Sequence, residues 1–152
     1  MSPRRFAAAA AGIMLSAILA SHGISKQVPV FATAWPVASG QVTSGFGGKH
    51  RGIDIAATAG TPVLAFAAGV VEAREASKGC GEQLRIRHEF GATSSYCNLA
   101  GIRVTAGDAV ARGAAVAEIA PASDRRKAHL HFELKIGGQK VDPLAHLPRI
   151  PE

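Results

Sequence analysis

The chain has 152 residues, enough for one domain with its own core and a short extension. Apolar residues make up 47% but aromatic residues only 5%, and 17 glycines with 8 prolines indicate short strands and tight turns, which excludes a helical bundle. The 17 basic and 11 acidic residues give a net charge of +6, which suits an anionic partner, but no basic cluster is interleaved with aromatic residues, so nucleic acid is not expected.

The N-terminus has the pattern of an export signal. Arg4 and Arg5 precede an apolar run over residues 6–20, and small residues follow it. Because a membrane-spanning helix needs about 20 apolar residues, residues 1–23 are predicted to be a signal peptide, with a short uncleaved anchor near a membrane as the alternative. We therefore expect the protein in the periplasm or cell envelope, either secreted or anchored by this segment.

The rest of the chain divides into a linker, one domain and a tail. Residues 24–34 are expected to form the linker, residues 35–147 the domain, and residues 148–152 the tail. Within the domain, five short strands are predicted besides the two alternating segments described below, over residues 61–65, 69–73, 84–88, 93–99 and 115–119. Many short strands with little helix predict a mainly β fold, a small antiparallel sheet or open barrel-like single domain with a metal-binding groove.

An early alternating segment places an acidic side chain opposite the core. Asp54 lies between Ile53 and Ile55, so its carboxylate should point away from the core. A single aspartate on the polar face of a strand is usually only solvated, but His50 precedes it by four residues in a glycine-rich turn.

The two cysteines, Cys80 and Cys97, are an even number in a chain predicted to reach an oxidising compartment. A disulfide is therefore expected, with two buried free thiols as the alternative. Two cysteines are too few to form a cysteine-type zinc site by themselves.

The clearest alternation of polar and apolar residues runs from residue 128 to residue 134. Because successive side chains of a strand point to opposite faces, three polar side chains share one face: His129, His131 and Glu133. The opposite face carries three apolar side chains that are expected in the core: Leu130, Phe132 and Leu134. Two imidazoles at this spacing can direct ring nitrogens at one metal ion or substrate; the alternative is a half-buried strand with a polar exposed face.

Together, His50, Asp54 and the His129–His131 pair offer the nitrogen and carboxylate ligands that zinc prefers. His50-x-x-x-Asp54, with Gly52 between, followed by His129-x-His131, resembles the lysostaphin/LytM-type zinc metallopeptidases, the twenty-third metallopeptidase family. The resemblance extends over about residues 35–147 and includes four flanking segments: WPVASGQVTSGFG, GTPVLAFAAGVVEA, VTAGDAVARGAAVAEI and VDPLAHL.

The resemblance implies a site and an activity. His50, Asp54 and His131 would bind one zinc ion, His129 would be a catalytic histidine beside it, and Glu133 would not be a ligand. Zinc lowers the pKa of a bound water to about 7 and polarises a carbonyl. The family cleaves stem peptides or cross-links of bacterial peptidoglycan, so an exported zinc metalloendopeptidase is expected.

This sequence departs from the family pattern at Asn98. The family commonly has a second catalytic histidine in a Tyr-x-His-Leu stretch, which here reads Tyr96-Cys97-Asn98-Leu99. An asparagine can donate a hydrogen bond to developing negative charge, but it cannot accept and return a proton. The alternative function is therefore a catalytically weakened, zinc-retaining module that binds peptidoglycan or activates a hydrolase. A Cys80–Cys97 bridge is expected to hold Tyr96 and Asn98 beside the metal.

Two other histidines are not expected to replace the missing one. The predicted strands 84–88 and 93–99 are expected to form a hairpin. Depending on the loop length, His88 would lie on the opposite face from Asn98 or roughly 20 Å from it along the strand, so a structural role at the hairpin end is expected for His88. His146 is expected at the surface.

The loop before the His-x-His strand carries Arg125, Arg126 and Lys127, where family members usually have glycine and serine. This basic run is either solvated or lines the substrate groove and favours the carboxylates of stem peptides.

A third interpretation of the protein's function is a biotinyl or lipoyl carrier domain, which the segment near Gly107 resembles. Such a domain needs a lysine at the turn of its hairpin, and residues 107–120 contain none.

Overall fold

The computed structural model describes residues 32–149. The predicted signal peptide and most of the predicted linker lie outside these residues, and the predicted domain boundaries stay predictions. The described part is built from strands and two short 3₁₀ helices: β1 (Gln41–Ser44), β2 (Ile53–Ala56), β3 (Pro62–Leu64), β4 (Gly69–Ser77), β5 (Gly81–His88), η2 (Glu89–Gly91), β6 (Ala92–Ala100), β7 (Ala109–Val110), β8 (Ala115–Ile119), β9 (His129–Ile136), β10 (Gln139–Val141) and η3 (Pro143–His146). Within residues 32–149, no helix is long and apolar enough to cross a membrane.

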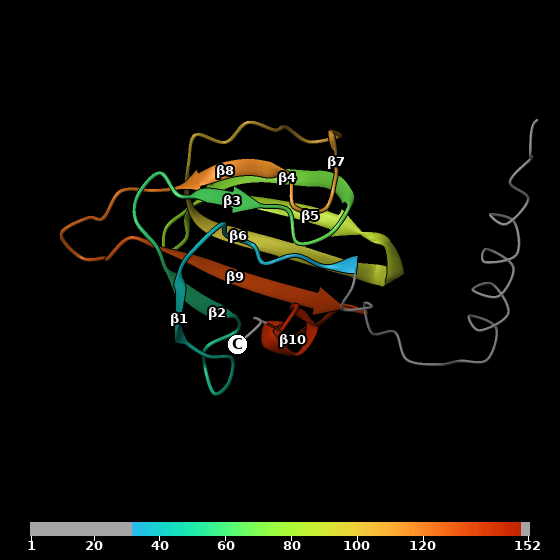
Figure 1. The fold of residues 1–152 in the computed structure, drawn as a ribbon, viewed down its shortest axis with the longest axis horizontal. Helices are drawn as coiled ribbons and strands as arrows, with labels where there is room; N and C mark the ends of the chain where they lie inside the picture. The colour runs from blue at the N-terminus through green and yellow to red at the C-terminus, as the bar shows by residue number, and fades with distance from the viewer. Residues whose placement is uncertain (1–31, 150–152) are drawn as a thin grey trace, which may run out of the picture.

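All strand pairs are antiparallel, and β9 lies in the interior of the sheet, between β2 and β6 (Figure 1). The main order is β1-β2-β9-β6-β5-β4-β7, so β9 pairs with β6 along one edge and with β2 along the other, where β10 also pairs with it. β8 pairs with the end of β6 and with β3. The prediction of a mainly β, antiparallel single domain is confirmed.

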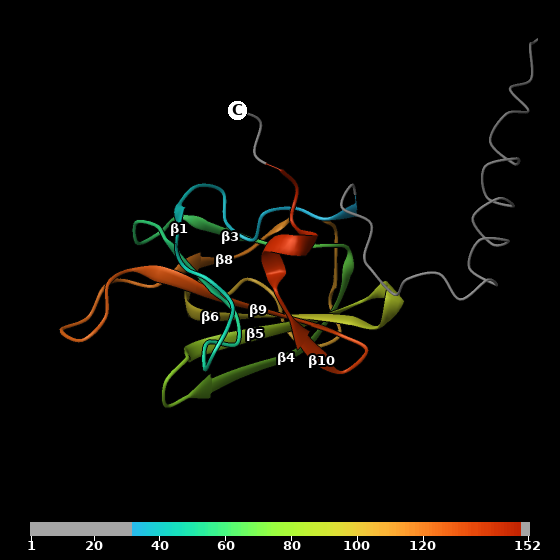
Figure 2. The same ribbon diagram turned by 90° about the horizontal axis from the view of Figure 1, so that it is seen from below.

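The sheet has one apolar face and one polar face because its strands alternate. The apolar face is completely buried along β2, β5 and β9, through seven side chains: Ile53, Ile55, Leu84, Ile86, Leu130, Phe132 and Leu134. Residues of β3, β8 and the segment after β3 complete this core: Val63, Phe66, Val116 and Ile119. Burial of each large apolar side chain is worth about 1.5–3 kcal/mol, so the core fixes which side chains remain on the opposite face. Figure 2 shows the same sheet turned by 90°.

His88 has the structural place that was predicted for it. It ends β5 and is buried, with Nδ1 3.0 Å from the Ala68 carbonyl oxygen and Nε2 2.7 Å from Ser94 Oγ. Ser94 Oγ also lies 3.0 Å from the Tyr96 hydroxyl, which accepts a hydrogen bond from the Phe66 backbone N–H. This buried polar chain faces the core and takes no part in the groove on the other side of the sheet.

Burial of His88 predicts a pH-dependent stability. Desolvation lowers the pKa of His88 below its ordinary value, although the backbone hydrogen bond to Ala68 opposes this effect. Below about pH 6.5 the unfolded chain therefore binds a proton that the folded chain does not, so the free energy of unfolding should fall as the pH falls. We expect a shallower fall in His88→Gln, measured by urea denaturation of metal-free protein. Burial also lowers the pKa of His146, but His146 is present in both proteins, so equal slopes would contradict the prediction.

The prediction that His146 lies at the surface is wrong. Its side chain is buried within η3, and its carbonyl oxygen accepts a 2.8 Å hydrogen bond from Thr33 Oγ1. Nearby, Trp35 Nε1 donates to the Pro148 carbonyl oxygen at 3.0 Å. These two hydrogen bonds connect the first described residues to the last ones, across a separation of 113 residues.

Candidate metal centre

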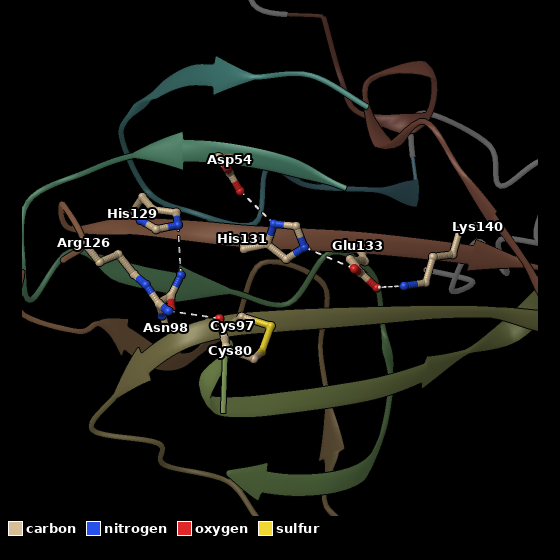
Figure 3. The surroundings of a disulfide bond; sticks show 10 residues. Asp54, Cys80, Cys97, Asn98, Arg126, His129, His131, Glu133 and Lys140 are labelled. Atoms are coloured by element: carbon tan, nitrogen blue, oxygen red, sulfur yellow. Dashed lines mark hydrogen bonds and ion pairs between the residues drawn. A yellow bond between two sulfur atoms is a disulfide. The ribbon is translucent and has the colours of Figure 1, made fainter. Parts of the chain in front are cut away.

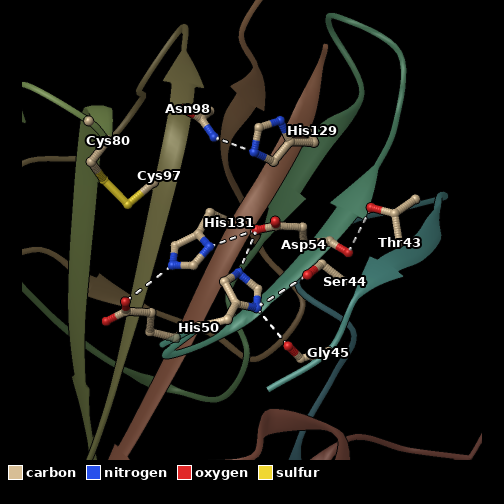
Figure 4. A network of polar contacts seen from close by, with 12 residues as sticks. Thr43, Ser44, Gly45, His50, Asp54, Cys80, Cys97, Asn98, His129 and His131 are labelled. Carbon is tan, nitrogen blue, oxygen red and sulfur yellow. Dashed lines mark hydrogen bonds and ion pairs between the residues drawn. A yellow bond between two sulfur atoms is a disulfide. The ribbon is translucent and has the colours of Figure 1, made fainter. Parts of the chain in front are cut away.

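Three predicted ligands lie together on the polar face of the sheet (Figure 4). Asp54 of β2 is directly opposite His131 of β9, and His50 comes from the turn just before β2. Asp54 Oδ1 lies 2.7 Å from His131 Nδ1 and 3.3 Å from His50 Nε2. One donor atom from each residue falls within 4.8 Å of the other two. This nitrogen, nitrogen and carboxylate oxygen set is one that suits zinc.

Hydrogen bonds on the far side of both imidazoles orient the rings toward the cluster. His50 Nδ1 lies 2.7 Å from the Gly45 carbonyl oxygen, so Nδ1 carries the hydrogen and Nε2 presents a lone pair to Asp54. His50 Nε2 is buried and has no hydrogen-bond partner among the described residues. A metal ion would satisfy this buried nitrogen, so the residues present fit the metal that the fold implies.

Two carboxylates flank the His131 ring. Its Nε2 lies 3.1 Å from Glu133 Oε1, opposite the Nδ1 that faces Asp54. The hydrogen bond to Glu133, and then Asp54, raises the pKa of His131, while His131 and Lys140 lower the pKa of Glu133 to about 2. An imidazole between two carboxylates favours positive charge at its nitrogens, which either a proton or a metal ion can supply. Glu133 therefore contacts the ring nitrogen that faces away from Asp54.

Gly52 allows His50 and Asp54 to approach β9. A Cβ atom at this position would lie 2.2 Å from the Phe132 carbonyl oxygen, which is too close for any side chain. Since the clash is with backbone, a larger residue would move the start of β2 away from His131.

His129 lies beside this cluster but makes different contacts (Figure 3). It shares the polar face with His131, two residues or about 6.6 Å along β9. Its Nδ1 lies 2.7 Å from the Lys127 carbonyl oxygen, so Nδ1 carries the hydrogen and Nε2 is the accepting nitrogen. That nitrogen lies 3.0 Å from Asn98 Nδ2, which donates to it.

A β-bulge directs Asn98 to the polar face. Cys97 pairs with Gln83 but Leu99 pairs with Glu82, so Asn98 is an extra residue in β6, and its φ is 67°. Its backbone N–H donates to the Cys80 carbonyl oxygen at 2.8 Å. The three-residue loop of η2 sets the register of the β5–β6 hairpin. Because of the bulge, the direction of the Asn98 side chain does not follow the alternation of the other β6 residues.

Tyr96 does not lie beside the candidate metal site, so this expectation is wrong. Its side chain is completely buried on the core face, and burial raises the pKa of its hydroxyl to about 12. The alternation of β6 places Cys97 opposite His131 on the polar face and Tyr96 opposite Phe132 in the core.

Arg126 lies in the groove that contains the site. It donates to Asn98 Oδ1 through Nη1 and to the Gly79 carbonyl oxygen at 3.1 Å through Nη2. The groove has a volume of about 480 Å³, and its charged and imidazole-bearing lining residues are His50, Asp54, Arg126, His129, His131, Glu133 and Lys140. Lys140 of β10 forms an ion pair with Glu133, with Nζ 2.6 Å from Oε2. The sequence does not predict this contact, because no local pattern indicates it.

Cys80 and Cys97 form a disulfide, with their Cα atoms 5.0 Å apart. The bridge connects residues 17 positions apart and adjoins both Gly79 and Asn98. It therefore stabilises the wall of the groove on the β5–β6 side.

We expect the double variant Cys80→Ser, Cys97→Ser to lose about 3 kcal/mol of unfolding free energy, because a bridge over a loop of this length restricts the unfolded chain. Urea denaturation of the oxidised wild type and the double variant measures the difference. The reduced wild type is the matched control and should unfold like the variant. A double variant as stable as the oxidised wild type would contradict the prediction.

One family profile and several known proteins are similar to this chain. The profile described as "Peptidase family M23" matches residues 48–143, more than half of the chain. A Pseudomonas aeruginosa "Lipoprotein NlpD/LppB homolog" is 41% identical over 76% of this chain and 40% of its own length. The "Murein hydrolase activator NlpD" of Salmonella typhimurium is 33% identical over 82% of this chain and 34% of its own. The Neisseria meningitidis "DD-carboxypeptidase/endopeptidase Mpg" is 35% identical over 68% of this chain and 24% of its own.

This chain therefore corresponds to less than half of each of these relatives. Among solved structures, a "zinc containing peptidase from vibrio cholerae" superposes with a TM-score of 0.70 and 31% identity, over 77% of this chain and 41% of the other. The residues that the family profile matches include His50, Asp54, His129 and His131. The chain belongs to peptidase family M23.

Proposed function

We propose that this protein is an exported zinc metalloendopeptidase that hydrolyses peptide bonds in bacterial cell-wall peptidoglycan. The observation that carries the proposal is the convergence of His50 Nε2, Asp54 Oδ1 and His131 Nδ1 in an open groove. The names of two similar proteins support the proposal: the DD-carboxypeptidase/endopeptidase of Neisseria meningitidis and the zinc containing peptidase of Vibrio cholerae. The Pseudomonas relative named as a lipoprotein supports a place in the cell envelope.

His50, Asp54 and His131, which line the groove, would hold one zinc ion. Zinc bound there would supply Lewis-acid polarisation of the scissile carbonyl and activation of a water molecule. His129 would accept and return a proton at Nε2, once that nitrogen exchanges its hydrogen bond from Asn98 for one from the reacting groups. Asn98 Nδ2 would then be free to donate to negative charge that develops on the substrate.

A second function is a zinc-retaining module that binds peptidoglycan and activates another hydrolase. It is favoured by Asn98, which provides no titratable group and donates to the accepting nitrogen of His129. The Salmonella relative named as a murein hydrolase activator supports the same alternative.

Release of soluble muropeptides from purified sacculi tests both functions. For the peptidase, we expect release by the wild type, loss of release after chelation, and recovery on addition of zinc. For the activator, we expect no release by the protein alone but faster release by an added hydrolase. Absence of both effects in protein that contains one zinc ion would refute the two proposals.

A further inference from the structure

We infer that Arg126 binds a free carboxylate of the substrate, so that the groove prefers stem peptides with ionised carboxylates over the same peptides in amidated form. This inference rests on the proposed peptidoglycan substrate. It concerns a residue outside the ligand set, in the loop before β9, and it names a chemical distinction that His50, Asp54 and His131 do not make.

The charge of Arg126 is not neutralised within the described part of the chain. Its partners, Asn98 Oδ1 and the Gly79 carbonyl oxygen, are both neutral, and no carboxylate of residues 32–149 forms an ion pair with it. Several other cations of the described chain do pair with carboxylates: Arg74, Arg85, Arg103 and Lys140. A guanidinium carries five N–H donors, so three remain after these two hydrogen bonds and can bind a carboxylate.

The position of Arg126 places that carboxylate close to the reacting bond. Arg126 contacts Asn98, and Asn98 contacts His129, so its guanidinium is one side chain removed from the proposed catalytic histidine. Figure 3 shows Arg126 and Lys140 at opposite ends of the row formed by His129, His131 and Glu133. Since Lys140 already binds Glu133 at 2.6 Å, Arg126 is the cation in this row that is open to a substrate anion.

The charge of the groove favours the same ligand. Among its lining residues, the two cations, Arg126 and Lys140, balance the two anions, Asp54 and Glu133. A zinc ion would add two positive charges, so the loaded groove would attract an anionic peptide.

An amidated substrate loses this interaction because a carboxamide is neutral and its N–H groups would face the N–H groups of Arg126. Charge-assisted hydrogen bonds are about twice as strong as neutral ones. The side chain of Arg126 is exposed, so solvent screening limits the gain, and we expect a preference of about tenfold rather than a hundredfold.

The test compares two synthetic stem peptides that differ only in whether their side-branch carboxylates are free or amidated. Dissociation constants are measured by calorimetry with zinc-loaded full-length protein, and chromatography verifies that each peptide stays intact. We expect the wild type to bind the free-acid peptide about tenfold more tightly, and Arg126→Gln to bind both peptides equally. Arg125→Gln is the matched control, since Arg125 has the same charge in the same loop but does not line the groove, and it should keep the preference.

The two peptides also separate carboxylate binding from positioning of Asn98. A wild type without preference, an Arg126→Gln variant that retains it, or an equal loss of affinity for both peptides in Arg126→Gln would overturn the inference. Its failure differs from failure of the proposed function. If the protein cleaves sacculi but binds both peptides equally, only the inference about Arg126 is contradicted. If it prefers the free-acid peptide but does not cleave sacculi, only the peptidase function is contradicted.

Discussion

Replacing His131 with alanine is expected to remove zinc binding and to lower muropeptide release to the level of sacculi without protein. The substitution leaves His50 and Asp54 as the remaining members of the cluster, and catalytic zinc sites need three protein ligands. It also removes the central residue, because His131 Nδ1 lies 2.7 Å from Asp54 Oδ1 and its ring centroid lies 5.1 Å from that of His50. Elemental analysis of purified protein and the sacculus assay measure the two effects.

A graded series makes this prediction specific to the metal. Glu133→Gln removes the carboxylate that accepts from His131 Nε2 but keeps His131 itself, so zinc affinity should fall by about 10–100-fold instead of being lost. Lys140→Met is the matched control, because the Lys140 ammonium forms an ion pair with Glu133 Oε2 and with no other carboxylate of residues 32–149, and its effect should be smaller than that of Glu133→Gln. Stoichiometric zinc in His131→Ala, or loss of zinc equal to it in Lys140→Met, would contradict this assignment of ligands.

Local sequence patterns were sufficient for the fold class and for the orientation of the main strands. The alternation in residues 128–134 placed Leu130 and Phe132 in the core and His131 on the opposite face, as observed. Such patterns predict which face a side chain occupies because a strand has a period of two. The apolar runs on either side of residues 89–92 also predict the hairpin of β5 and β6.

Local sequence patterns do not predict contacts between segments that are distant in the sequence. The bulge at Asn98 interrupts the period of β6, so the alternation of that strand says nothing about where the Asn98 side chain points. His146 is buried beside residues at the start of the domain, and Arg126 is distinguished from Arg125 only by its contacts with Gly79 and Asn98. The three proposed ligands were found through the family resemblance, whereas their common location follows from the register of β2 against β9.

Replacing Asn98 with histidine is expected to increase muropeptide release by about 10²-fold, the lower end of the usual contribution of a general acid or base. The new imidazole would stand beside His129, where Asn98 now donates to Nε2, and would supply a second group able to exchange protons. Histidine is also among the residues that accept a positive φ, which this position requires at 67°. The Arg126 guanidinium next to it would favour the neutral imidazole at neutral pH, the form that acts as a base.

The matched control is Asn98→Gly, which removes the amide without adding a base and fits the left-handed backbone. We expect Asn98→Gly to release muropeptides no faster than the wild type, so that a gain confined to Asn98→His identifies proton transfer and not simple release of His129. Initial rates on sacculi, with zinc content measured for each protein, provide the comparison. An inactive wild type with an active Asn98→His variant would favour the hydrolase-activating module, since the groove and metal site would then be intact and only the second proton-transfer group missing. Equal rates in all three proteins at equal zinc content would show that residue 98 does not limit the reaction, and His129 alone would then carry the proton chemistry of the site.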